Sequence, residues 1–370
     1  MRDHRTPDPG PDPEEEPGPA PVPQSPTRRR TRVALVTLGW ALPILVVVAL
    51  IAAAIVRVPY VVISPGAATP LDDQVVSITG ASTYEHDGRL LYLTVTVSNR
   101  DPNLYRWLFA SLDPNAAVMK REAVIGCASY AASDRLAVDE MDQSQDAAKA
   151  VALEHLGYTV TDEPSRVQVI DVLCEGPSDG ALELGDVITS VDGTDVARAE
   201  EIRPIIVAHR PGETVAFGVL RGDERLTVDV RLGEHDDLPD AGIVTRTVTP
   251  HRFPVDVTID TARVSGPSAG LAFSLAIVDD LSPGSLTGGR TVAVTGTIAD
   301  DGSVGPVGGV AQKAVTARRA GARLMLVPKG EEAEARRRAG DMRVVGVATF
   351  DDAVRALSGE AITGTAADGP

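Results

Sequence analysis

Lysine is scarce in this 370-residue sequence, and the few positions that keep it are therefore informative. Of the 35 basic residues, only those at positions 120, 149, 313 and 329 are lysines, and the others are arginines. Arginine stays charged throughout the working pH range of a protein, whereas a buried lysine can lose its proton. A lysine in this chain is thus a candidate for chemistry that arginine cannot perform.

Histidine is also sparse, and none follows position 251. None of the histidines sits in a recognisable catalytic or metal-binding spacing, and the sequence contains neither H-E-x-x-H nor C-x-x-C. Those are the motifs that hold zinc in hydrolases and in structural sites. We therefore expect neither a metal site nor a cofactor. The histidines are His4, His86, His155, His209, His235 and His251.

Basic residues are outnumbered by acidic ones, and the formal net charge is −17. This balance argues against nucleic acid as a partner, because phosphate binding needs a basic surface. The sequence has no G-x-x-x-x-G-K-[ST] phosphate loop, so it encodes no ATP-driven unfolding step. Its two cysteines, Cys127 and Cys174, could form a disulfide in an oxidising exterior, but they make no disulfide scaffold. For each of them we favour the role of a small buried residue.

The N-terminal region combines a polar tail with a long uncharged run. Residues 1–32 are rich in proline and acidic residues and should be disordered, as should residues 361–370. Residues 33–56 carry no charge, and these 24 residues exceed the ~20 needed for a transmembrane helix. Four arginines just before the run, against Arg57 alone after it, place the N-terminus in the cytoplasm and later residues outside. The alternative is a cleaved signal peptide, whose apolar region is usually shorter, roughly 7–15 residues.

One serine lies in a pattern typical of a nucleophile. Gly266-Pro267-Ser268-Ala269-Gly270 fits G-x-S-x-G, a strained turn that exposes a serine hydroxyl. That hydroxyl needs a group to take its proton, and the histidine that would follow it in an α/β-hydrolase is absent. A serine of this kind, taken alone, is more often a helix cap. Either Ser268 caps a helix, or its base is not a histidine.

Two lysines follow Ser268 and could supply that base. Lys329 lies in the charged turn P-K-G-E-E and should be solvated, whereas Lys313 lies in the small, apolar stretch G-G-V-A-Q-K-A-V. Desolvation would lower the pKa of Lys313 and leave a neutral amine that can accept the serine proton. Lys313 is the better candidate, although a single lysine on a helix is more often solvated.

Residues 160–236 form a segment of their own. The run L-x-x-G-D-x-I-x-x-V-D-G from Leu182 to Gly193 resembles a PDZ domain, the alternative being an ordinary hairpin with a D-G turn. The resemblance implies that strand 167–172 and a helix near 199–209 flank a groove. There an extended peptide would complete the sheet edge through backbone hydrogen bonds.

The catalytic candidates themselves resemble a known family. Gly266-Pro267-Ser268-Ala269-Gly270, then T-G-T at 295–297, then Gly308-Gly309-V-A-Q-Lys313, is similar to the proteolytic domain of the Lon family of Ser–Lys peptidases. The resemblance implies Ser268 as nucleophile, Lys313 as general base and Thr295 as the hydroxyl that orients the amine. Gly266, Pro267, Ala269, Gly308 and Gly309 would support the site. Cytoplasmic Lon enzymes usually carry Asp where Ser265 stands, which leaves no role for a carboxylate there.

The resemblance also implies an architecture: an α/β (α+β) Lon-type domain, split by a PDZ domain and preceded by one transmembrane helix. Residues 58–159 would form its first half and residues 237–360 its second. We expect a helix at 139–156, strands at 60–64, 89–98, 291–298, 323–327 and 343–347, and helices at 310–320, 331–339 and 351–357.

The function expected from this architecture is an ATP-independent, membrane-anchored serine endopeptidase. The PDZ groove would select unfolded or flexible protein and peptide substrates outside the cell membrane. Because Lon-like domains generally form rings, the resemblance is compatible with a homo-oligomer. Two alternatives remain: an inactive peptide-binding scaffold at the membrane, and a PDZ-bearing tail-specific processing protease, whose expected serine context is missing here.

Overall fold

The computed structural model describes residue 43, residues 45–262 and residues 264–359. The chain divides into two compact units, residues 1–55 and 56–370. In the first unit the described residues, 43 and 45–55, are helical. The predicted tails (1–32 and 361–370) and the first part of the predicted membrane segment lie outside the described residues. Within the described ranges, no helix is both long enough and apolar enough to span a bilayer.

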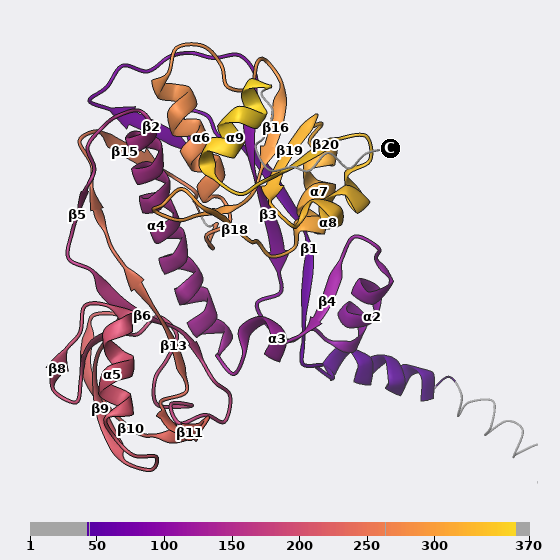
Figure 1. Cartoon of the computed structure of the whole chain (residues 1–370). Helices are drawn as coiled ribbons and strands as arrows, with labels where there is room; N and C mark the ends of the chain where they lie inside the picture. The colour runs from indigo at the N-terminus through magenta and orange to yellow at the C-terminus, as the bar shows by residue number, and fades with distance from the viewer. Residues whose placement is uncertain (1–42, 44, 263, 360–370) are drawn as a thin grey trace, which may run out of the picture. The chain divides into compact units, whose positions relative to one another are not determined.

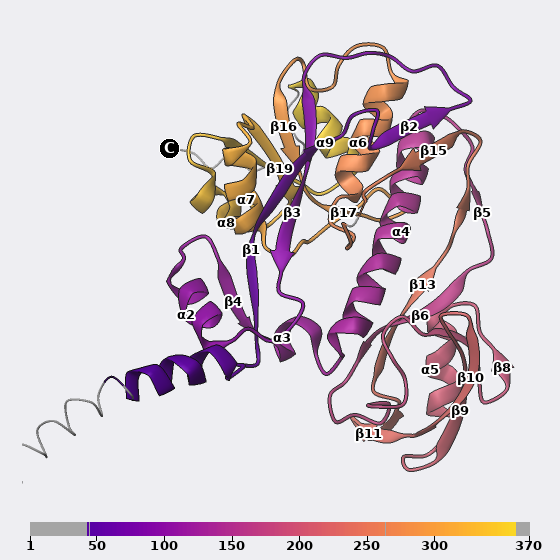
Figure 2. The ribbon, with the colours of Figure 1, turned by 180° about the vertical axis from the view of Figure 1, so that it is seen from behind.

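A mixed six-stranded sheet is the centre of the second unit (Figures 1 and 2). Its order is β20-β19-β16-β3-β1-β4. β16 runs parallel to β3 and β19, whereas β1 is antiparallel to β3 and β4. Three strands precede residue 160 and three follow residue 290, so the two predicted halves share one sheet. The strands are β1 (Tyr60–Pro70), β3 (Arg89–Val97), β4 (Ala117–Lys120), β16 (Thr291–Val294), β19 (Leu324–Pro328) and β20 (Arg343–Val347).

Helices cover both faces of this sheet because its central strands are apolar on both sides. Val292 and Val294 belong to one hydrophobic cluster and Ala293 to another, as the period of two in a strand requires. The first cluster is completed by α4 (Tyr130–His155), α6 (Gly270–Leu281) and α9 (Phe350–Ser358). The second is completed by α7 (Val310–Arg319) and α8 (Glu332–Ala339).

A second, antiparallel sheet has the order β10-β9-β7-β6-β13, with β8 paired to β7. It encloses its own core around Val167, Phe217 and Ile206. The elements are β6 (Arg166–Val172), β7 (Val187–Val191), β8 (Thr194–Asp195), η1 (Ala199–Glu201), α5 (Ile202–Val207), β9 (Thr214–Arg221), β10 (Glu224–Arg231) and β13 (Ile243–Val248).

The edge of this second sheet differs from the prediction. β6 pairs with β7 on one side and with β13 on the other, so strand 167–172 is internal and cannot be the open edge. The edge strand is β13, which lies beyond the boundary at residue 236 that the sequence suggested. No local signal in the sequence marks this strand, because Ile243–Val248 continues directly into the second half without a break in composition.

Short elements connect these layers. β2 (Val76–Thr79) pairs with β15 (Asp256–Ile259), and β5 (Thr161–Asp162) with β14 (His251–Arg252). β11 (Gly233–His235) pairs with β12 (Leu238–Asp240), and β17 (Thr297–Ile298) with β18 (Val304–Gly305). Two helices, α2 (Leu104–Leu112) and α3 (Glu122–Ile125), lie between β3 and α4.

The predicted helix at 139–156 is longer than expected and begins at Tyr130. Ser129 starts it, because its side chain accepts a hydrogen bond from the Ala132 amide, as N-cap residues do. The predicted strand at 291–298 is interrupted at residues 295–296, between β16 and β17. The first two turns of α4 escaped prediction because they contain little apolar periodicity.

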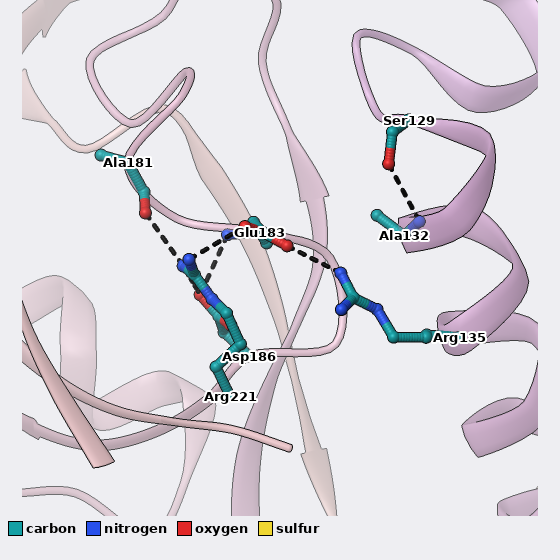
Figure 3. Close-up of polar contacts among 7 residues, drawn as sticks. All are labelled: Ser129, Ala132, Arg135, Ala181, Glu183, Asp186 and Arg221. Carbon is teal, nitrogen blue, oxygen red and sulfur yellow. Dashed lines mark hydrogen bonds and ion pairs between the residues drawn. The ribbon is translucent and has the colours of Figure 1, made fainter. Parts of the chain in front are cut away.

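The start of α4 is joined to the PDZ-like second sheet by a disulfide and by ion pairs. Cys127, just before α4, and Cys174, just after β6, form the disulfide that the sequence left open, and neither is buried, so the favoured role of small buried residues is wrong. Arg221 of β9 binds Asp186 through Nε at 2.8 Å and Nη2 at 2.7 Å, and Asp186 is fully buried. Glu183 accepts from Arg221 at 2.9 Å and from Arg135 of α4 at 2.7 Å (Figure 3). The two regions are therefore tied at the beginning of α4.

Candidate active site

Ser268 lies in a turn just before α6. The helix begins at Gly270 and its N-cap is Ala269, which has no capping side chain, so Ser268 does not cap the helix. Pro267 lies three residues before the first residue of the helix and so is not part of its first turn. Gly266 adopts φ +92°, a conformation that other residues rarely tolerate, and the chain bends there just before the serine.

α4 holds this turn from the other side. The Gly266 amide donates to the Ala137 carbonyl at 2.7 Å, and Ser144 Oγ donates to the Pro267 carbonyl at 2.9 Å. Ser144 is only 4% exposed. The backbone on the N-terminal side of Ser268 is thus fixed by a helix that comes from the first half of the chain.

Lys313 projects from the first turn of α7. Gly309 precedes that helix with φ +67°, and a Cβ atom there would lie 2.9 Å from Val95 of β3. Only glycine lets α7 begin this close to the sheet. Gly308 shows no comparable constraint, because a Cβ atom there would meet nothing within 4 Å. The positive φ and the closeness to Val95 thus explain why the second residue of the Gly-Gly pair is a glycine.

The structure brings the three predicted polar residues together. Lys313 Nζ lies 2.8 Å from Ser268 Oγ and 3.0 Å from Thr295 Oγ1. Thr295 Oγ1 in turn donates to the Ser268 carbonyl at 3.2 Å. Thr295 is fully buried in the break between β16 and β17, and Lys313 is 1% exposed. Thr295 therefore orients the amine and the serine backbone at once.

Burial changes the acidity of the amine. Desolvation lowers the pKa of Lys313 from 10.5 to about 8, and Glu331 opposes this effect weakly as a nearby negative charge. At neutral pH roughly a tenth of such an amine is uncharged. The Lys313 amine can then accept a hydrogen bond from the Ser268 hydroxyl across the same 2.8 Å. The pair is chemically suited to proton transfer.

A cleft of about 530 Å³ lies beside the serine turn. α4 contributes Glu140 and Ser144, the end of β13 contributes Arg246, and the serine turn contributes Pro267. β17 and the loop after it form the remaining wall. Its lining reaches Pro267, the residue directly before Ser268, but includes neither Ser268 nor Lys313.

Two contributors to the site were missed from the sequence. Ser144 falls at helical spacing from Met141 and Ala148, so a polar residue within a buried stripe was the available signal. Glu331 binds the Val307 amide at 3.0 Å and so fixes the loop before α7. It comes from the P-K-G-E-E turn, and the sequence does not indicate that it lies near Lys313. Ser265 is exposed.

Comparisons with known proteins agree with this geometry. A family model of the PDZ domain matches residues 155–232, and a model of the Lon protease (S16) C-terminal proteolytic domain matches residues 251–355. The chain has a PDZ domain and a Lon-type proteolytic domain. The S16 domain is that of a Ser–Lys serine peptidase family. The PDZ-like antiparallel sheet and the Lon-like mixed sheet described above correspond to these two domains.

Individual relatives match parts of the chain. A Lon protease from Ureaplasma parvum is 32% identical over 143 residues, covering 37% of this chain and 18% of that protein. A probable periplasmic serine endoprotease, DegP-like, from Ectopseudomonas mendocina is 33% identical over 82 residues, covering 22% and 17% respectively. The crystal structure of a PDZ domain from the Listeria monocytogenes SdrC-like protein shares 28% identity, covers 21% of this chain and 85% of that one, and has a TM-score of 0.21. The chain thus spans less than a fifth of the curated relatives named here.

Proposed function

We propose that the chain is a serine endopeptidase that cleaves peptide bonds with a Ser268–Lys313 dyad. The observation that carries this proposal is the 2.8 Å contact between a serine hydroxyl and a lysine amine that is 1% exposed. An inactive scaffold would have no need of a buried lysine in this position, since burying an ammonium group is costly.

The chemistry follows from the contacts. Neutral Lys313 takes the Ser268 proton as Oγ attacks the substrate carbonyl, and the resulting ammonium then protonates the departing amine. An acyl-enzyme remains, and Lys313 is neutral again. Its amine then takes a proton from a water molecule, which attacks the acyl group and releases Ser268. Ser268 precedes the first turn of α6, where backbone N–H groups and the helix dipole favour the negative charge of the tetrahedral intermediate.

Turnover of fluorescein-labelled casein by the purified full chain tests the dyad. Ser268→Ala and Lys313→Ala should each reduce turnover to background while leaving the unfolding transition cooperative. Lys149→Ala is the matched control, because desolvation also lowers the pKa of Lys149, which is only partly buried and lies outside the contacts of Ser268. Hydrolysis that persists in both dyad variants would reject the assignment.

We further propose that the PDZ groove positions substrates for the dyad. A groove of about 370 Å³ lies between α5 and β13, and its lining includes Ile202, Ile206, Leu238 and Ile243. β13 lines both cavities, since Ile243 and Thr245 face this groove while Arg246 and Thr247 face the cleft beside Ser268. A peptide that binds along β13 could continue from one to the other. The apolar lining residues favour an apolar side chain on the peptide, and Arg203, Asp236 and Asp240 at the same groove offer polar contacts beside it.

Anisotropy of labelled peptides of about ten residues, bound to the Ser268→Ala chain, tests the groove. Leu238→Asp should weaken binding, because it replaces an apolar lining side chain of the groove with a charged one. Leu173→Asp is the control, because Leu173 is 50% exposed against 44% for Leu238 and does not line the groove. Equal binding by both variants would place peptide recognition elsewhere.

Residues 33–56 support a further proposal, that the chain is anchored in the cell membrane with its second unit outside. The support is a run of 24 uncharged residues preceded by an arginine cluster. Because the 370 residues contain no phosphate loop, we propose that hydrolysis does not consume ATP. Flotation with vesicles, and casein turnover measured with and without ATP, test these two statements.

A further inference from the structure

α2 is a helix whose apolar side chains are left uncovered. None of its nine residues is buried. Leu112 is 71% exposed and Phe109 is 67% exposed, the two highest values for large hydrophobic side chains among the described residues from Val56 onwards. A helix this short is marginal in water and needs packing to persist. Its apolar outer face therefore has no packing partner among the described residues.

The exposed side chains form one stripe. Leu104, Leu108, Phe109 and Leu112 follow the spacing of a single helical face. The other side of the helix packs on the protein, since the Trp107 ring lies 5.9 Å from that of Tyr60 in β1. Both views show α2 beside β4 at the end of the sheet (Figures 1 and 2). Met119 of β4, 42% exposed, adds to the apolar surface.

The stripe lies where the chain leaves the uncharged run of residues 33–56. The Val56 carbonyl accepts the Leu104 amide at 3.1 Å, and the Pro102 carbonyl accepts the Val58 amide at 3.0 Å. The first residue of α2, Leu104, is thus hydrogen-bonded to the last residue of that run, Val56. With nine residues α2 is about 14 Å long.

The polar residues around the stripe suit an anionic lipid surface. Arg57 together with residues 100–121 carries five basic and two acidic side chains, a local balance of 5 − 2 = +3 in a chain of net charge −17. α2 itself contains Arg106 and no acidic residue, and its Tyr105 and Trp107 are the aromatic types enriched at membrane interfaces. Apolar stripe, aromatic residues and basic flank together are the composition of an interfacial helix.

We propose that α2 is an interfacial helix that lies in the outer surface of the bilayer, with Leu104, Leu108, Phe109 and Leu112 inserted between anionic lipids. The inference rests on the proposed membrane anchor. It adds a second contact with the membrane, which fixes the orientation of β1 and β4 to the lipid surface. The sheet, and with it the catalytic residues, is then held at a defined height.

Site-directed spin labelling of the full chain tests this. Phe109→Cys, Leu112→Cys and, as control, Val138→Cys are labelled separately with the native disulfide intact. Val138 is 53% exposed and lies on α4. Each protein is reconstituted into vesicles of phosphatidylcholine and phosphatidylglycerol, recovered by flotation, and compared for collisions with oxygen and with a water-soluble nickel chelate.

Labels at 109 and 112 should shift towards oxygen accessibility and lose nickel accessibility, while the label at 138 stays accessible to nickel. Nickel-accessible labels at 109 and 112 in floated protein would overturn the inference and leave the anchor intact. Spin–spin broadening at 112 that persists without lipid would overturn it in favour of a second copy of the chain on this face. Protein that fails to float at all would contradict the anchor, and with it this inference.

Discussion

Ser144 donates a hydrogen bond of 2.9 Å to the carbonyl of Pro267, the residue directly before Ser268. Nearer its N-terminal end the same helix, α4, is bonded to the PDZ domain through Arg135 and Glu183 (Figure 3). One helix therefore contacts both the PDZ domain and the turn that carries Ser268. The precision of that turn should depend on α4.

Ser144→Ala should lower kcat for casein by about fivefold and leave KM nearly unchanged. The loss of one hydrogen bond, worth about 1 kcal/mol, would loosen the Pro267 carbonyl and the position of the hydroxyl. Ser129→Ala, which removes the N-cap of the same helix, is the control. It should cost about 1 kcal/mol of unfolding free energy and leave kcat unchanged. Equal effects of the two variants on kcat would contradict a positioning role for Ser144.

The activity should depend on pH through Lys313. Because burial lowers the pKa of Lys313 to about 8 and only the neutral amine accepts a proton, kcat/KM should rise about tenfold per pH unit below pH 8 and level off above it. Stopped-time assays on the wild type between pH 6 and pH 10 provide the profile. A midpoint near the usual histidine pKa, about 6.5, would point to a different base.

The dyad should also reduce the stability of the protein. An amine with a pKa of 10.5 when unfolded and about 8 when folded costs roughly 3 kcal/mol whenever it is charged, offset in part by its hydrogen bonds. Lys313→Met should therefore abolish turnover and raise the unfolding free energy at pH 7 by about 1 kcal/mol. The gain is complete below pH 8 and should vanish as pH rises towards 10.5. Urea unfolding at pH 7 and at pH 10 measures it, and a gain unchanged by pH would contradict the explanation.

The two arginines that bind Glu183 should differ greatly in importance. Arg221→Ala leaves the fully buried Asp186 without its partner and should cost about 3–5 kcal/mol of unfolding free energy. Arg135→Ala breaks an exposed pair, with the arginine 59% and Glu183 41% exposed, and should cost less than about 1 kcal/mol. Denaturant unfolding of the two variants compares them directly. A similar loss of unfolding free energy in the two variants would show that the burial of Asp186 does not determine how much each ion pair contributes.

Much of the site could be predicted because its signals are local. The serine turn, the Gly-Gly-x-x-x-Lys spacing and the absence of a late histidine each lie within a few residues of sequence. The structure brings Ser268, Thr295 and Lys313 together as that pattern implied. Their chemical roles stay a proposal that the variants above test.

The parts that escaped prediction depend on contacts between distant segments. The edge strand β13 is defined by pairing with β6, more than 70 residues earlier, and no local pattern shows which strand ends a sheet. The Cys127–Cys174 bridge likewise requires that the start of α4 and the loop after β6 meet, which spacing alone does not reveal. Ser144 and Glu331 reach the site from the helix predicted at 139–156 and from the charged turn before the helix predicted at 331–339. Neither pattern indicates contact with Ser268 or Lys313.

The protonation state of Lys313 is the most direct test of the account. The chain has only four lysines, so [¹³C]lysine labelling gives four side-chain signals, and the one lost in Lys313→Arg is thereby assigned. The account predicts that this signal titrates with a pKa of about 8 in the folded protein. A midpoint near that of free lysine, about 10.4, would mean that the amine is charged at working pH and cannot serve as the base.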